Sequence, residues 1–298
     1  MESVLEYREE PCGLEPIAIV INLACDPTAA ELVGEARGIR MLMKKAFTFH
    51  DPLILKILRN LSDHDNLKPL FLDYLPDLVQ AVTSLEESSA AQKINAELLA
   101  ERRNRKERMK PNPLDDFEHE SFLDEDFGDE TDERTGGGKK EDFALECLGL
   151  LANLTLEDLD FARVLSDLNL LNWLQSKLSL GLKHFEDDLL LEIIRLIGTT
   201  CLDEKAALMI ANCGIVTDLI SLLNSHQEDD EIVCQILGVF HRLSCHESTI
   251  KILIEDTQTP AYLVDLMHDK NKEIRRICDA TLSLISNGGF TAKLSFAS

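Results

Sequence analysis

The chain has few aromatic residues and few positive charges. Aromatic residues make up 5% of its 298 positions, and one of them is tryptophan. The 30 lysine and arginine residues are outnumbered by 54 aspartate and glutamate residues, which gives a formal net charge of −24. A surface of this charge repels DNA, RNA and anionic lipid. We therefore expect no nucleic-acid partner.

Long apolar runs, a leader sequence and paired cysteines are also lacking. No run of about 18 apolar residues occurs, so we expect no membrane-spanning helix and no direct membrane insertion. The first residues have neither the basic nor the apolar region of a signal peptide. The eight cysteines include no Cys-x-x-Cys pair, so we interpret them as reduced, buried small hydrophobes of an intracellular protein. They lie inside apolar runs (Cys147, Cys201, Cys234, Cys278) or near the edges of such runs (Cys12, Cys25, Cys213, Cys245).

The apolar residues are arranged in helical repeats. They make up 45% of the chain, mostly as Leu, Ile, Val and Ala, and the alternating β-branched runs of a sheet protein are absent. Similar segments recur with equivalent positions at Asn22, Asn60, Asn153, Thr199, Arg242 and Leu284. Within each block these positions are 38 to 46 residues apart. A period of about 40–47 residues made only of helices is typical of armadillo or HEAT repeats. We predict an all-α, armadillo-type α-solenoid.

The predicted domain organisation is two armadillo blocks separated by an acidic insertion. The blocks are 13–83 and 141–287, and a tail follows at 288–298. The segment 84–140 begins as a polar helix extension and continues into 112–135, which has eleven acidic residues and one arginine. Such a segment buries too little apolar surface to offset its ordering entropy, so we expect disorder there.

The helix predicted at 231–243 explains why the repeats must stack. Its apolar residues cover more than one face, so neighbours must cover it on two sides. Burial of about six such side chains contributes on the order of 10 kcal/mol before entropy is subtracted. A single repeat could not stay folded. The chain starts and ends with the last helix of a unit, so we expect a segment of a longer solenoid.

Catalytic and metal sites are poorly supported by the sequence. His241, Cys245 and His246 are close, and the first two have ligand spacing on a helix, but no second ligand pair is visible. The segment 136–140 reads GGGKK; it lacks the hydroxyl residue and the preceding strand of a phosphate loop, so we interpret it as a flexible linker. Acidic pairs such as Asp229-Asp230 precede apolar helices, where capping explains them. We predict no enzyme activity, no metal and no cofactor.

A groove along the array is the remaining candidate site. In armadillo arrays the third helix of each repeat lines a concave surface, where an asparagine often holds the backbone of an extended partner. The candidate partner-binding residues are Asn22, Asn60, Asn153, Arg195 and Arg242. The alternative is that the asparagines satisfy local backbone groups. Because arginine and leucine replace asparagine in the last units, we expect contacts there through side chains more than through a peptide backbone.

A basic cluster at 102–110, RRNRKERMK, allows two interpretations. It could be a nuclear localisation or phosphate-binding patch. The alternative is a solvated helix face that pairs loosely with the acidic segment that follows, because the two are at high effective concentration. We favour the second interpretation.

Several long stretches resemble the C-terminal armadillo repeats of one family. QEDDEIVCQI, TPAYLVDLMHDKN and KEIRRICDATLSLI, with GLLANLTLEDLDFARVL and EDDLLLEIIRLIGTTC upstream, are similar to kinesin-associated protein, the non-motor subunit of heterotrimeric kinesin-II. The resemblance covers 142–285 and extends to 16–82. It does not account for the acidic insertion. It indicates a C-terminal or truncated portion of such a protein.

The resemblance implies a non-catalytic adaptor. The family's solenoid binds the tail region of the paired motor subunits and links them to cargo or adaptor proteins, including in intraflagellar transport. The implied location is the cytoplasm, the microtubule cytoskeleton and the cilium. The alternative function is a generic armadillo scaffold of the import or junction adaptor type, but the tryptophan and asparagine array of import receptors is absent.

Overall fold

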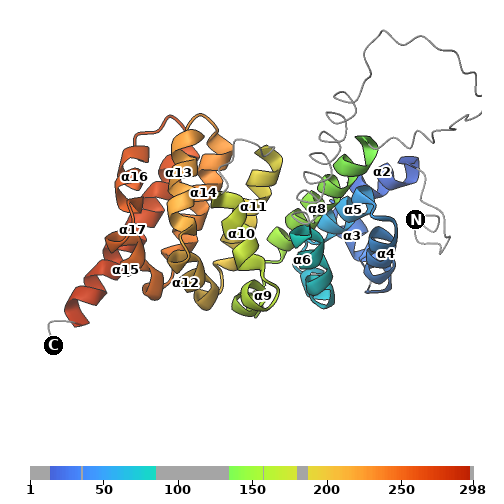
Figure 1. Ribbon diagram of the computed structural model, residues 1–298, viewed down its shortest axis with the longest axis horizontal. Coiled ribbons are helices and arrows are strands. Elements are labelled where there is room, and N and C mark those ends of the chain that lie inside the picture. Colours follow the sequence, from blue (N-terminus) through green and yellow to red (C-terminus); the bar gives the residue numbers. More distant parts are fainter. Residues whose placement is uncertain (1–13, 35, 85–133, 157, 180–186, 296–298) are drawn as a thin grey trace, which may run out of the picture.

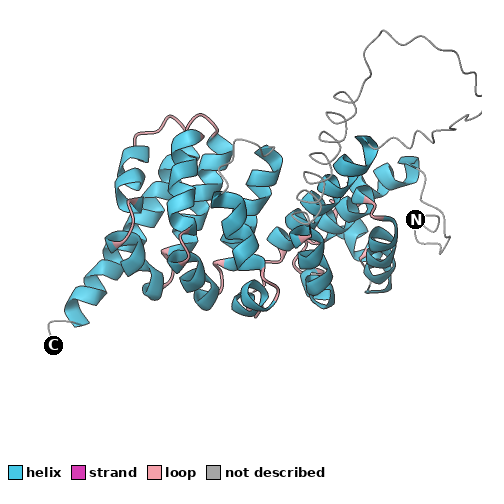
Figure 2. Ribbon diagram, in the orientation of Figure 1, coloured by secondary structure: helices cyan, strands magenta, loops and turns pink. Residues whose placement is uncertain are grey.

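The protein is built from helices, as the computed structural model in Figures 1 and 2 shows. The structure describes residues 14–34, 36–84, 134–156, 158–179 and 187–295. Within these ranges it contains fifteen α-helices and one 3₁₀ helix, and no strand. The predicted all-α, armadillo-type solenoid is therefore confirmed. Residues 112–133 of the acidic segment expected to be disordered and the basic cluster at 102–110 lie outside the described residues, whereas the last two residues of that segment, 134–135, begin helix α8.

The described helices form five units of three, preceded by α2 (Leu14–Leu23) in the position of a third helix. The units are α3 (Pro27–Val33), α4 (Ala36–Phe49), α5 (Pro52–Leu61); η1 (Lys68–Tyr74), α6 (Leu75–Thr83), α8 (Arg134–Asn153); α9 (Phe161–Asp167), α10 (Leu170–Ser179), α11 (Asp187–Thr200); α12 (Glu204–Asn212), α13 (Ile215–Ser225), α14 (Asp230–Leu243); and α15 (Glu247–Glu255), α16 (Thr259–Leu266), α17 (Lys272–Ser295).

Equivalent helices of successive units pack side by side in rows. The third helices make the most extensive row, in which α2, α5, α8, α11, α14 and α17 contact one another in this order. The first helices α9, α12 and α15 form a second row, and the second helices α6, α10 and α13 form a third. The result is an elongated array with α2 near one end and α17 at the other (Figure 1).

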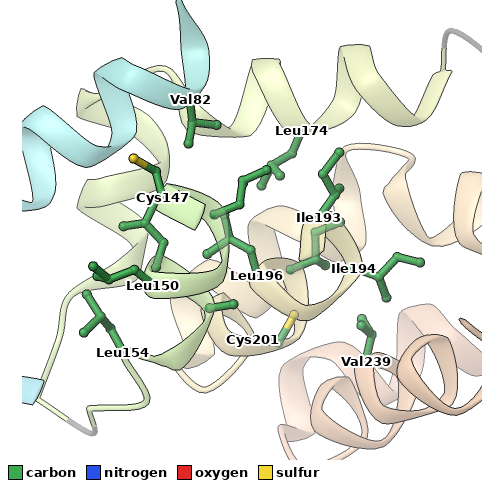
Figure 3. Close-up of a cluster of buried hydrophobic side chains, with 14 of the residues drawn as sticks. Val82, Cys147, Leu150, Leu154, Leu174, Ile193, Ile194, Leu196, Cys201 and Val239 are labelled. Carbon is green, nitrogen blue, oxygen red and sulfur yellow. The ribbon is translucent and has the colours of Figure 1, made fainter. Parts of the chain in front are cut away.

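Helix α8 joins the two parts of the chain that flank the undescribed segment 85–133. It packs against α5 and α6 on one side and against α11 on the other. Figure 3 shows the shared core at this junction, where Val82 of α6 and Leu174 of α10 lie with side chains of α8 and α11. The segment thus leaves the array between the second and third helices of one unit. The division into blocks stays a prediction, but the third helices on the two sides of the segment, α5 and α8, belong to one continuous row.

The wide apolar arc of α14 is buried as the sequence predicts. All of its large apolar side chains are buried, and the helix contacts α11, α13 and α17. Its start is fixed by Asp229, whose carboxylate accepts hydrogen bonds from the backbone N–H groups of Glu231 and Ile232. Helix α5 starts in the same way at Asp51, with Pro52 at its first position.

Each unit begins with a short first helix, such as α9 and α12 with seven and nine residues. Two features differ from the sequence-based expectations. Helix α8 begins at Arg134, so the glycines at 136–138 lie within a helix and not in a linker. Helix α17 continues to Ser295, past the predicted end of the array at 287. The packed parts of α8 and α17 supply hydrogen-bonded turns from which further turns propagate.

The prediction that all cysteines are buried is wrong for Cys25 and Cys245, which are exposed. Both follow the end of a third helix, in the turn that leads to the next unit. Cys147, Cys201 and Cys278 are buried, and burial raises the pKa of the Cys201 thiol to about 12. The seven cysteines in the described part of the chain are free thiols, and Cys12 lies outside it.

Candidate partner-binding surface

Side chains at the predicted asparagine positions form hydrogen bonds between successive third helices. We call each of these hydrogen bonds a tie. The last C=O groups of an α-helix have no partner within the helix. Asn60 of α5 donates from Nδ2 to the carbonyl oxygen of Ile21 in α2, at 3.0 Å. Asn153 of α8 donates in the same way to the carbonyl oxygen of Arg59 in α5, at 3.1 Å. Each asparagine thus caps the C-terminal end of the preceding third helix.

The same tie continues at Thr199 and is absent at Asn22. The hydroxyl of Thr199 in α11 donates to the carbonyl oxygen of Ala152 in α8, at 2.6 Å, and both groups are buried. Asn22 is exposed and donates to Ala18 of its own helix, at 3.1 Å. The structure therefore brings Asn60 and Asn153 into the junctions between units, whereas Asn22 stays apart from them.

The side-chain amide of Asn153 makes two further hydrogen bonds, one of them to Arg195. The Nδ2 group of Asn153 also donates to Ser62 Oγ, at 3.2 Å, and its Oδ1 atom accepts a hydrogen bond from Arg195 Nη2, at 3.0 Å. The Nη1 atom of Arg195 in turn donates to both carboxylate oxygens of Glu192, at 2.9 and 3.0 Å. These two predicted site residues lie together, and their polar groups satisfy one another.

A charged cluster joins α5, α8 and α11 beside these residues. Arg59 of α5 pairs with Glu146 of α8, at 3.4 Å, and with Glu192 of α11. Glu146 and Glu192 are largely shielded from solvent, with side-chain exposures of 13% and 7%. Burial raises the pKa of the Glu146 carboxyl, and the nearby charges of Arg59 and Lys56 oppose this increase. The cluster thus connects α5, α8 and α11 through charge pairs, and for Glu146 the cost of burial exceeds the gain from pairing.

Arg242 of α14 occupies the position of Thr199 one unit later, but it forms no such tie. Its Nη1 atom lies 2.7 Å from where a Cβ on Gly198 would stand. In the described part of the chain no hydrogen bond or ion pair reaches its guanidinium. Burial lowers the pKa of Arg242, and the positive charge of Arg195 lowers it further. Arg242 is therefore a half-buried cation that has no ion-pair partner among the described residues.

His241, Cys245 and His246 do not converge on a common point. His241 Nδ1 contacts the hydroxyl of Thr281, at 3.2 Å, while Cys245 Sγ donates back to the carbonyl of His241, at 3.4 Å. His246 Nε2 contacts the carbonyl oxygen of Cys201, at 2.8 Å. Across the described ranges no group of three or more His, Cys, Asp or Glu side chains could hold a metal ion.

Sequence reasoning missed a second set of ties between units. His64 Nε2 contacts the carbonyl oxygen of Ala24, at 2.9 Å, and His246 makes the equivalent contact to Cys201. Both histidines stand four residues after an aligned repeat position, which is a signal that the sequence offered. The Arg59–Glu146–Glu192 cluster was missed too, although a glutamate within the apolar run LLLEIIRL indicates a buried charge pair.

A cleft on another face lies between α6 and α10. It has a volume of about 420 Å³ and is lined mainly by polar side chains, among them Gln80, Asn169 and Asn172. Trp173 also lines it, and its buried indole N–H has no hydrogen-bond partner in the part of the chain that is described. This cleft lies on the row of second helices and contains none of the predicted site residues.

Taken together, the stacked units define a protein of the α-solenoid class, whose rows of equivalent helices present extended surfaces. Two engineered proteins of known crystal structure have a similar fold. One is 16% identical, with a TM-score of 0.60 over 92% of this chain and 90% of the other. The second is also 16% identical, with a TM-score of 0.58 over 91% of this chain and 54% of the other. At this identity the likeness concerns the fold alone.

A family match provides the link to function. The model of the kinesin-associated protein family matches residues 1–97 and 120–291, so the chain belongs to the kinesin-associated protein family. The family is one of non-catalytic, kinesin-associated adaptors, and this association indicates a cytoplasmic, cytoskeletal location.

The membrane-crossing potential of the described helices is limited to one bent pair. No described helix is by itself long and apolar enough to cross a membrane, and α12 and α13 reach this threshold only together, across a bend of 71°.

Proposed function

We propose that this protein is the adaptor subunit of a heterotrimeric kinesin-II, which binds the tail region of the paired motor subunits and links them to cargo or adaptor proteins. The match to the kinesin-associated protein family on both sides of the acidic segment carries this proposal. The proposed process is microtubule-based transport, including intraflagellar transport in cilia. The proposed location within the cell is the cilium.

The proposed partner surface is the exposed side of the third-helix row. It includes Asn22, Asn60, Asn153, Arg195 and Arg242, which come from α2, α5, α8, α11 and α14. Two kinds of role follow from their contacts. Asn60, Asn153 and Arg195 position the helices through hydrogen bonds to neighbouring units. Asn22 is exposed, and Arg242 has donors available for a partner.

Size-exclusion chromatography of this chain with the purified tail heterodimer of the two motor subunits tests the proposal. We expect the two to elute together, earlier than either does alone. Separate elution at micromolar concentrations, for this chain and for a longer version that includes any flanking repeats, would contradict the adaptor function. A heterodimer of motor tails from a different kinesin class serves as the control and is expected to elute separately.

A further inference from the structure

The row of ties between third helices is interrupted at one junction. Asn60, Asn153 and Thr199 each donate to a carbonyl of the preceding third helix, one residue before the aligned position there. The corresponding acceptor for Arg242 is the carbonyl of Gly198. Its guanidinium lies against Gly198 but forms no hydrogen bond to it. At this junction, therefore, the aligned side chain does not cap the preceding helix.

Two glycines lie near Arg242 on α11 and α14, and the space beside one of them is open. Gly238 stands one turn before Arg242 on α14, and a Cβ added there would meet nothing within 4 Å. Gly198 lies opposite on α11 and would contact mainly the arginine itself. An acceptor group could thus reach the guanidinium from the open side of the row without displacing a side chain at Gly238.

Two neighbouring arginines on third helices are paired with carboxylates, whereas Arg242 has no such pair among the described residues. Arg195, one unit earlier, is neutralised by Glu192. Arg276 of α17 is paired with Glu273, at 2.5 Å. His241 lies near both Arg242 and Arg276; burial lowers its pKa first, and their positive charges lower it further, which favours the neutral ring. The site thus offers one unpaired positive charge on a molecule whose net charge is −24.

We propose that the guanidinium of Arg242, which lies near Gly198 and Gly238, receives a single glutamate or aspartate carboxylate from a peptide segment of a partner protein that is otherwise uncharged. A planar guanidinium matches a carboxylate through two parallel N–H···O bonds, which are stronger when partly shielded from water. A single cation within an acidic molecule suits one carboxylate and disfavours a nucleic acid, whose repeated phosphates the rest of the surface repels. The inference rests on the proposed partner role of the third-helix row.

A fluorescent peptide provides a defined probe. We would measure fluorescence anisotropy with a labelled dodecapeptide of Gln and Ala that carries a single central Glu (the Glu peptide), against the same peptide with Gln at that position, at 50 mM and 200 mM NaCl. The wild-type chain is expected to prefer the Glu peptide, and R242Q is expected to weaken its binding about tenfold or more. R163Q removes one arginine charge from α9, where the side chain is 77% exposed, and is expected to change binding less than twofold.

A second variant tests the site without changing Arg242. G238E places a glutamate one turn before Arg242, in the favourable orientation for a pair four residues apart. The new carboxylate is expected to occupy the guanidinium and to abolish preference for the Glu peptide, while G238Q adds similar bulk and is expected to reduce binding less. Thermal unfolding of each variant checks that the array is intact.

The outcomes separate this inference from the proposed function. Equal affinity of wild type and R242Q for the Glu peptide, or an equal loss with R163Q, would overturn the inference, as would binding of a phosphoserine peptide with no binding of the Glu peptide. If the motor tails bind but the peptide experiments give one of these contrary results, the inference about Arg242 is wrong and the proposed adaptor function is kept. If the Glu peptide binds through Arg242 but motor tails do not bind, the adaptor function is the part that fails.

Discussion

One repeat position carries two kinds of side chain with different consequences. Asn60, Asn153 and Thr199 are short donors that cap the end of the neighbouring third helix. Arg242 at the same position is longer and carries a positive charge, and its guanidinium has no hydrogen-bond or ion-pair partner in the described part of the chain. Side chains at this position therefore form hydrogen bonds across the junctions before α14, whereas the donors of Arg242 form none within the described residues.

The tie made by Thr199 is expected to stabilise the junction between α8 and α11. T199V removes the hydroxyl and leaves the buried carbonyl of Ala152 without its donor, which should lower the free energy of unfolding by about 1–2 kcal/mol. T200V is the matched control, because Thr200 bonds within its own helix to Ile197, whose carbonyl also accepts from Cys201 N. Urea unfolding measures both. Equal losses in the free energy of unfolding for T199V and T200V would contradict a stabilising role of the hydrogen bond between units.

Glu146 is expected to make stability depend on pH. Its pKa is raised in the folded protein, mainly by burial, so the folded state binds the proton more tightly than the unfolded state does. The ionised Glu146 carboxylate therefore lowers the free energy of unfolding at pH values above its folded-state pKa. This loss of stability disappears as the pH falls through the folded-state pKa towards the pKa of Glu146 in the unfolded chain.

E146Q should therefore stabilise the protein slightly at pH 7, and the gain over wild type should shrink towards zero as the pH is lowered. Urea unfolding between pH 4 and pH 8 measures this difference. E141Q, which removes an exposed carboxylate from the same helix, should show no such trend. A gain for E146Q that grows as the pH falls would contradict the account.

The spacing of the aligned residues was visible in the sequence, but their hydrogen-bond partners were not. Asn153 could be placed on a third helix by its apolar neighbours. Its acceptor, the carbonyl of Arg59, belongs to a helix on the other side of the acidic segment, and only the packing of α8 on α5 brings them together. Local pattern predicts which face a residue takes, whereas a contact across units depends on the stacking.

At the scale of elements, strongly amphipathic helices were predictable and short ones were not. The third helices α11 and α14 have 14 residues each and long apolar stripes. The first helices α9, α12 and α15 have seven to nine residues, too few for a clear period, and they form because neighbouring units cover them. Helix α8 shows the same dependence, because its packed half extends a helix through glycines that the sequence alone favours as a linker.

Two glycines at equivalent positions on third helices should respond differently to alanine. A Cβ on Gly149 would stand 2.4 Å from the guanidinium of Arg59, which is held in place by Glu146 and Glu192. G149A should therefore destabilise the protein by about 1–3 kcal/mol. A Cβ on Gly238 meets nothing, so G238A should stabilise its helix by about 0.5–1 kcal/mol. Urea unfolding compares the two; a gain in stability for G149A would contradict the described position of Arg59.

The whole molecule combines a continuous core with a surface of strongly negative charge. The hydrophobic core extends from Ile17 in α2 to Ile285 in α17, through α8 at the centre. The array thus presents the third-helix row as one extended surface, on which the exposed Lys56 and the half-buried Arg242 are positive points. A partner with carboxylates at matching separations can engage both points at once, which raises affinity above that of either contact alone.

Calorimetric titration of the motor-subunit tail heterodimer into this chain tests the central claim most directly. The wild-type chain should bind, and the double variant K56Q/R242Q on the third-helix row should bind at least tenfold more weakly. The double variant R163Q/K251Q, which removes two exposed charges from first helices, should bind within twofold of wild type. Failure of the wild-type chain to bind, or equal weakening in the two double variants, would contradict a kinesin adaptor that uses its third-helix row.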